Sequence, residues 1–145
     1  MIGKTIGAIL GTVAFALLFG VPKKYFPYCG VIGGLGWLSY WLLQQAGLSA
    51  VEATVVAVIL VALSSRFCAV FCECPVTVFL ISGIYPLVPG AGIYRTAYYL
   101  VRDQKRLALE SGYRAVCIVV AIVLGIVIVH ELPNRFFAII RRRKQ

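Results

Sequence analysis

Five long apolar stretches constrain this chain more than any other feature of its sequence. They cover residues 1–20, 28–43, 52–65, 76–99 and 115–129. A membrane-spanning helix needs roughly 20 predominantly apolar residues. Charged residues make up only 13% of the chain, whereas soluble domains carry about 25%. The pattern predicts an all-α, polytopic integral membrane protein, with five transmembrane helices in a single domain over residues 1–145 and a basic tail at 135–145.

The charges predict an orientation. The chain has 14 Lys/Arg against 5 Asp/Glu, a net charge of +9, and much of the excess flanks the apolar stretches at Lys23, Lys24 and residues 141–144. Positive residues in such places face the cytoplasm and contact anionic lipids. We therefore expect a multi-pass protein of the cell (inner) membrane with its N-terminus outside and its tail inside. A re-entrant fourth stretch would instead put the basic residues of 101–114 inside and the tail outside.

Several function classes find no support in the residues. The chain has no Walker A loop, no GxSxG and no HExxH, and it has one histidine and five acidic residues, so we do not expect an enzyme. It lacks nucleic-acid-binding motifs, so no nucleic-acid partner is expected. Cys68, Cys72 and Cys74 form the one cysteine cluster, with His130 far away in sequence. We interpret these thiols as small apolar side chains at a helix end, with metal or redox chemistry as the weaker alternative. No metal and no cofactor are expected.

Glycines recur at helical spacing in the first two stretches. Gly3, Gly7 and Gly11 are four residues apart, and Gly30 and Gly34 repeat the spacing in the second stretch. Glycines on one helix face allow another helix to approach backbone to backbone. The partner helix lies either in the same chain or in a second one.

Local signals predict the ends of the later helices. Ser49 and Glu52 form a capping box that starts the third helix, with a proton-relay role for Glu52 as the alternative. This helix is expected to end near Ser65, where Arg66 follows, and residues 101–114 are expected to form a charged connector.

The fourth apolar stretch cannot be one continuous helix. Residues 83–92 read GIYPLVPGAG, with two prolines and three glycines. Each proline removes a backbone N–H and clashes with the preceding turn. A membrane segment broken in this way leaves backbone polar groups unpaired, which is tolerated where they are buried in protein or line a polar cavity.

This break is the predicted substrate site. A second half-helix starting near Gly90 would present free N–H groups and a partial positive charge to an anionic group. Arg95, about one turn further on, is placed to clamp a carboxylate, unless it extends to the lipid headgroups instead. The predicted substrate-binding residues are Pro86, Pro89, Gly90, Ala91, Gly92, Tyr94 and Arg95.

Three segments together resemble a known family. They are VAFALLFGVP at 13–22, CGVIGGLGW at 29–37 and IYPLVPGAGIY at 84–94, and their spacing is similar to the C-terminal half of threonine/serine exporters between about Thr12 and His130. The resemblance implies the small subunit of a split exporter that acts with a larger companion, itself with five membrane helices. It implies export of threonine and serine, or of C4-dicarboxylates such as succinate. It does not extend to Arg95.

The sequence thus predicts a subunit of a secondary exporter for small carboxylate metabolites. This subunit is expected to act with a companion subunit or to form a homo-oligomer. Two other classes compete with this reading. The first is a membrane scaffold or assembly subunit that transports nothing, and the second is a channel-type pore. A broken helix favours a transporter over a scaffold, because a scaffold has no need of unpaired backbone groups within the membrane.

Overall fold

The computed structural model describes residues 2–131, and every regular element in this range is helical. This confirms the all-α part of the predicted fold class. Residue 1 and residues 132–145, which include the basic tail at 135–145, lie outside the described residues. The helices are α1 (Ile2–Leu18), α2 (Phe26–Gln45), α3 (Ala50–Cys72), α4 (Val76–Ile84), α5 (Gly90–Val101) and α6 (Lys105–His130), with 3-10 turns η1 (Lys23–Tyr25) and η2 (Tyr85–Leu87).

Two of the described helices, α3 and α6, are long and apolar enough to cross a membrane. The segments Val76–Leu87 and Gly90–Val101 add a third crossing if the bent pair is counted as one span. Helix α1 is apolar but shorter. The count of five crossings therefore stays a prediction.

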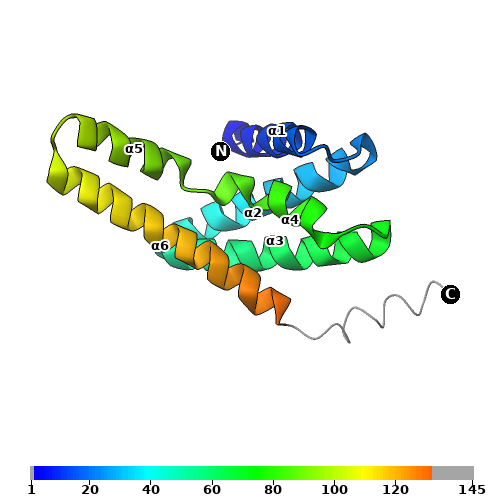
Figure 1. Ribbon diagram of the computed structural model, residues 1–145. Helices are drawn as coiled ribbons and strands as arrows, with labels where there is room; N and C mark the ends of the chain where they lie inside the picture. The colour runs from blue at the N-terminus through cyan, green and yellow to red at the C-terminus, as the bar shows by residue number, and fades with distance from the viewer. Residues whose placement is uncertain (1, 132–145) are drawn as a thin grey trace.

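The helices form a bundle with a projecting hairpin (Figure 1). Helices α1 to α4 and the C-terminal half of α6 lie together, around buried side chains such as Ile32, Val58, Val61 and Phe79. Helix α5 has no buried residue and packs mainly on α6. Residues 90–114, here called the α5–α6 hairpin, extend beyond the other helices.

Glycines let α2 pack closely against α1. A Cβ atom added to Gly33 would lie 2.1 Å from Oγ1 of Thr12, and one added to Gly34 would lie 2.8 Å from Cγ1 of Ile9. At Gly30 the nearest atom would be 3.2 Å away, also on Ile9. These positions have no room for a larger side chain, so the two helix backbones can approach each other.

Two glycines of α1, Gly3 and Gly7, are different, because they face away from the other described residues. A Cβ atom on Gly3 or Gly7 would have no atom of residues 2–131 within 4 Å. On Gly11 it would make an ordinary contact of 3.6 Å with the ring of Tyr85. The first two glycines therefore leave an open strip on the outer side of α1.

Helix α3 starts as predicted but ends later. The backbone N–H of Ser49 donates to the Glu52 carboxylate at 2.9 Å, and the Glu52 N–H donates to the Ser49 hydroxyl at 3.3 Å, which confirms the capping box. The helix then continues through Arg66 to Cys72 and stops at Glu73, whose φ of 51° is left-handed. The expected end at Ser65 is wrong because Arg66 is accommodated within the helix. Its guanidinium donates to the carbonyl of Val129 near the end of α6.

The expected charged connector is also mostly helical. Only residues 102–104 separate α5 from α6, which begins at Lys105. Its charges suit a helix: Arg114 donates to the Glu110 carboxylate at 2.9 Å across one turn. Ala108 and Ala115 are buried. A connector expected from charge alone is therefore replaced by an amphipathic first part of α6.

Candidate functional site

The chain bends sharply where the two prolines stand. Helix α4 ends at Ile84, a 3-10 turn covers 85–87, and α5 begins at Gly90. Between them Val88 is extended, with φ −64° and ψ 131°. The two helical segments are bent by 50° relative to each other. Helix α5 thus has its own N-terminus beside the bundle, at the residue where the sequence predicts it.

The first backbone donors of α5 are only partly used. The N–H of Gly90 donates to the carbonyl of Val88 at 2.8 Å, and the N–H of Ile93 donates to that of Pro89 at 3.0 Å. For the N–H groups of Ala91 and Gly92, no acceptor is found among residues 2–131. The N-cap residue is a proline, which has no side chain able to cap them. Two donors therefore remain for a ligand.

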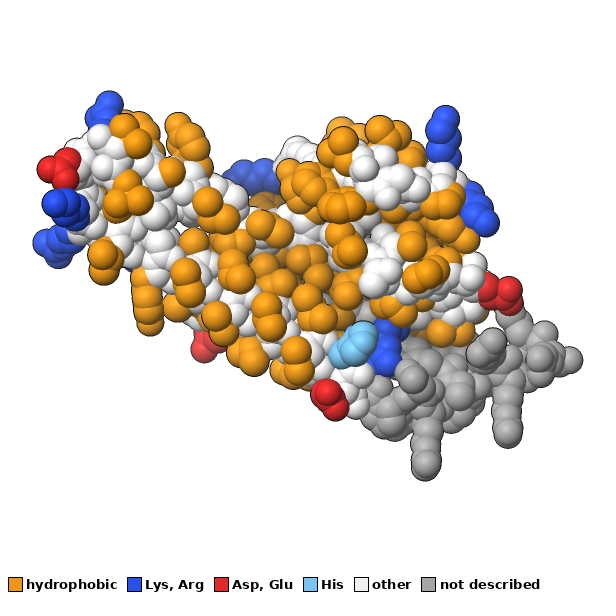
Figure 2. All heavy atoms as spheres, in the orientation of Figure 1, with side chains coloured by type: hydrophobic (Ala, Val, Ile, Leu, Met, Phe, Trp, Pro, Cys, Tyr) orange, Lys and Arg blue, Asp and Glu red, His pale blue; other side chains and the backbone are white. Residues whose placement is uncertain are grey.

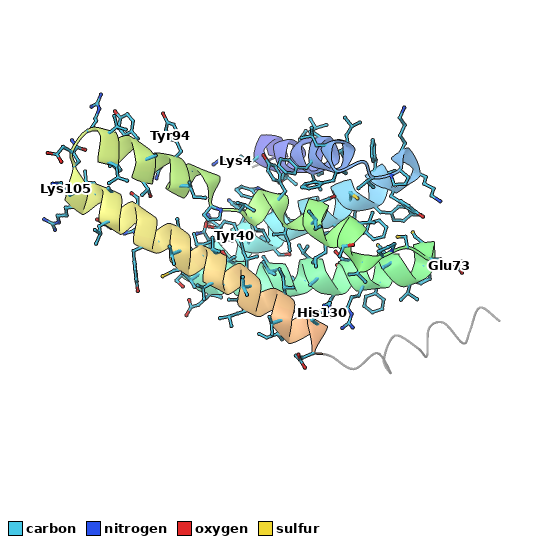
Figure 3. All side chains as sticks on the ribbon, viewed as in Figure 1. Lys4, Tyr40, Glu73, Tyr94, Lys105 and His130 are labelled. Atoms are coloured by element: carbon cyan, nitrogen blue, oxygen red, sulfur yellow. The ribbon has the colours of Figure 1, made fainter. Side chains whose placement is uncertain are left out.

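A cavity of about 430 Å³ lies at this junction. Its walls come from α2, from the start of α5 and from the α6 segment that packs against α5, and Figure 3 places Tyr40 beside the bend. We call it the junction cavity. It is lined by Tyr40, Pro89, Ala91, Gly92, Arg95, Tyr99, Leu107, Glu110, Ser111, Arg114, Ala115 and Ile118.

The junction cavity combines two guanidinium groups with one carboxylate. Arg114 is paired with Glu110, but their side chains are 75% and 55% exposed, so the pair is well solvated. Arg95 has no hydrogen bond or ion pair with the part of the chain that the structure describes. Its planar group is therefore available to bind a carboxylate through two hydrogen bonds. The cavity has an excess of one positive charge and suits a small anionic or zwitterionic ligand.

The structure brings together four of the seven predicted substrate-binding residues. Pro89, Ala91, Gly92 and Arg95 line the junction cavity, and Pro86, Gly90 and Tyr94 do not. Tyr94 is 70% exposed and stacks on Tyr98 with ring centroids 6.3 Å apart. Figure 3 shows it on the projecting hairpin. Consecutive residues of a helix point about 100° apart, so Tyr94 and Arg95 do not share a face.

Five polar residues of the cavity were not predicted from the sequence: Tyr40, Tyr99, Glu110, Ser111 and Arg114. One signal was available for α6. Residues 107, 111, 114 and 118 have the spacing of one helix face, and Glu110 and Arg114 are one turn apart. The tyrosines have no comparable local signal, because they reach the cavity through tertiary packing.

The cysteine cluster lies elsewhere, at the end of α3. Cys68 and Cys72 are in its last turns, Cys74 follows it, and all the cysteines are free thiols. Burial, with a contribution from Cys72, raises the pKa of the Cys74 thiol, which favours the neutral form. In the range 2–131 no three metal-ligating side chains are grouped to hold an ion.

Comparison with known proteins decides the family. The sequence profile described as Threonine/Serine exporter, ThrE, matches residues 4–132. This chain belongs to the ThrE family. ThrE proteins are threonine/serine exporters, so they are membrane transporters and not enzymes. The bend and the junction cavity both lie within the matched residues.

A relative of this ThrE chain is an uncharacterised protein of Haemophilus influenzae. The two are 31% identical over 100 residues, which make up 66% of this chain and 32% of the relative. The aligned part therefore spans about a third of the relative's length. No solved structure matches this ThrE chain significantly.

Proposed function

We propose that this ThrE chain is a subunit of a secondary exporter for small carboxylate metabolites, and that the substrate's carboxylate docks in the junction cavity. The substrates are threonine and serine, or C4-dicarboxylates such as succinate. One observation carries the proposal. Ala91 and Gly92, whose backbone N–H groups have no acceptor among residues 2–131, line the same cavity as Arg95 and Arg114.

These groups suit a carboxylate for physical reasons. The N-terminus of a helix carries a partial positive charge, and its free N–H groups point along the axis toward an anion. Arg95 follows about one turn later and can add two parallel hydrogen bonds. Glu110 adds selectivity: its carboxylate would attract the ammonium group of an amino acid and repel the second carboxylate of a dicarboxylate.

The two alternatives explain less of the site. A scaffold subunit has no use for a polar cavity with unpaired donors beside a broken helix. A channel-type pore would carry a voltage-driven current without coupling, which planar-bilayer recording would detect.

We further propose that the exporter is completed by a companion membrane subunit, with a homo-oligomer as the alternative. The open strip at Gly3 and Gly7 supports a second chain, since nothing among residues 2–131 fills it. The length of the Haemophilus influenzae relative also supports it, because about two thirds of that protein lies beyond the aligned residues.

We expect five crossings of the cell (inner) membrane, with the N-terminus outside and the C-terminus in the cytoplasm. An odd number of crossings places Lys23, Lys24 and the basic tail on one side. A phosphatase or fluorescent-protein reporter fused after Gln145 measures this directly. Cytoplasmic fluorescence without phosphatase activity is expected. An active phosphatase at the tail would overturn this orientation and favour the re-entrant fourth segment.

Arg95→Gln tests the substrate site. Losing one charge-assisted hydrogen bond costs about 1.5–3 kcal/mol, so the apparent substrate constant for efflux should rise about 10- to 100-fold. The assay follows labelled threonine and labelled succinate leaving cells whose own copy is replaced by the variant. Tyr94→Phe is the matched control, because this neighbour lies outside the cavity, and it should leave the constant unchanged.

Glu110→Gln in the same assay separates the two substrate classes. If the carboxylate holds an ammonium group, threonine efflux weakens and succinate efflux does not. If the substrate is a dicarboxylate, removing the negative charge strengthens its binding.

The Arg95→Gln experiment has a contradicting outcome as well. Unchanged apparent constants for both substrates in that variant would show that Arg95 extends to solvent or headgroups and does not clamp the carboxylate.

A further inference from the structure

The α5–α6 hairpin has a second side that the proposed transport site does not use. An apolar groove of about 620 Å³ runs between its helices, lined by Thr96, Leu100, Lys105, Ala108, Leu109, Gly112 and Tyr113. It shares no residue with the junction cavity. Apart from Lys105 at one end, its walls are aliphatic or aromatic carbon with one threonine, so it suits a hydrocarbon chain.

A basic pocket continues the groove toward the turn of the hairpin. This pocket of about 520 Å³ is lined by Lys105, Arg106, Leu109, Glu110 and Tyr113. Lys105, Leu109 and Tyr113 belong to both spaces, so the groove and the pocket form one continuous site. Figure 2 shows Lys and Arg side chains gathered at this end of the hairpin, with hydrophobic side chains behind them.

The charges at the pocket are free to bind an anion. Lys105 approaches the Asp103 carboxylate at 3.6 Å, but the two side chains are 82% and 85% exposed, so the pair is weak. Arg106 forms no ion pair with residues 2–131. Glu110 lines both this pocket and the junction cavity, and its carboxylate is paired with Arg114. Positive charge therefore prevails at the end of an apolar groove.

The length of α6 places this site at the correct depth for a lipid. Its 26 residues extend about 39 Å, at about 1.5 Å per residue. The hydrocarbon core of a bilayer is about 30 Å thick, and about 40–45 Å with its headgroup layers. A spanning α6 thus has Lys105 and Arg106 at headgroup depth, and Leu109 and Gly112 one to two turns nearer the hydrocarbon.

We propose that the groove and the basic pocket bind one anionic phospholipid. An acyl chain lies in the groove against Leu100 and Leu109, and the phosphate lies between Lys105 and Arg106. The apolar wall of the groove matches an acyl chain, and the basic pocket matches a phosphate at headgroup depth. Together they indicate an anionic phospholipid as the ligand class.

Native mass spectrometry of the full chain tests this lipid site. The protein is purified in detergent and titrated with dioleoyl phosphatidylglycerol or dioleoyl phosphatidylcholine. We expect one phosphatidylglycerol to be retained in preference to phosphatidylcholine. Lys105→Gln with Arg106→Gln should weaken this retention about 30-fold, at about fivefold per basic residue. Leu109→Gln should weaken the binding of dioleoyl phosphatidylglycerol. Dihexanoyl phosphatidylglycerol, whose short chains bind more weakly, should bind this variant and the unchanged protein equally.

The control removes the same charge at the opposite end of the bundle. Lys23→Gln with Lys24→Gln should retain phosphatidylglycerol like the unchanged chain. Equal retention of the two lipids, or equal losses in both double variants, would overturn the proposal. A site that binds inorganic phosphate as tightly as the long-chain lipid would also overturn it, because the groove would then contribute nothing.

Discussion

Replacing Pro89 by alanine and Gly90 by leucine together is expected to abolish efflux while the chain still inserts in the membrane. With both changes the backbone can become helical from Leu87, just after the retained Pro86, into α5. The N–H groups of Ala91 and Gly92 would then donate to the carbonyls of Leu87 and Val88, four residues back, as in any α-helix. The two donors that the junction cavity offers to a carboxylate would disappear.

Helix propensities favour a continuous helix in the double variant. Within a helix, proline is about 3 kcal/mol less favourable than alanine, and glycine is about 1 kcal/mol less favourable than the best helix formers. The double variant therefore shifts the balance toward a continuous helix by about 3 kcal/mol, through Pro89, because Gly90 already belongs to α5. Leucine at position 90 meets no steric obstacle at its first atom, because an added Cβ has nothing within 4 Å. Loss of efflux would thus report the loss of the bend and not a clash.

Two measurements are needed on the same variant. Efflux of labelled threonine and succinate should fall to background at matched membrane levels, and hydrogen exchange at Ala91 and Gly92 should slow down. Pro27→Ala is the control, because Pro27 lies in the first turn of α2, where a missing N–H costs nothing. Normal efflux together with slowed exchange would place the substrate site elsewhere.

The position of the bend was predictable because covalent chemistry decides it locally. Pro86 and Pro89 cannot donate to the helix ladder, and α5 begins at Gly90 as this predicts. The start of α3 was predictable for a similar reason, since the Ser49–Glu52 capping box needs only four consecutive residues. Rules that act over one helical turn succeed here without knowledge of the fold.

The rest of the cavity depends on tertiary packing, which no local rule contains. Glu110 and Arg114 face Arg95 only because α6 turns back along α5, and Tyr40 comes from a helix about 50 residues away. Tyr94 lies outside the junction cavity because neighbouring helix residues point in different directions. Charge density suggested a connector over 101–114, but residues 105–114 form the first part of α6, where Ala108 is buried, and only residues 102–104 lie between the helices.

Replacing Gly7 by leucine is expected to separate this chain from its partner without unfolding it. Gly3 and Gly7 face outward on α1 near the exposed Leu10. Each glycine costs a helix about 1 kcal/mol relative to alanine. A surface that contacts only lipid gains nothing in return, whereas a second helix gains a close backbone approach. A leucine side chain would hold that helix away.

Cells produce the tagged variant in place of their own copy of the protein, and the complex is extracted in mild detergent. The quantity measured is the mass of this complex. The unchanged chain should appear in a larger complex, whose mass distinguishes a companion subunit from further copies. Gly7→Leu should appear alone, with its own melting temperature unchanged, and Gly7→Ala should give an intermediate result.

Gly33→Leu is the contrasting control for this experiment. An added Cβ at Gly33 would lie 2.1 Å from Oγ1 of Thr12, so a leucine there must separate α1 from α2 within the chain. That variant should lose its own folded state, and overpacking of this kind costs about 1–3 kcal/mol or more. If Gly7→Leu keeps the larger complex and full efflux, the strip on α1 faces lipid, and any partner must contact another helix.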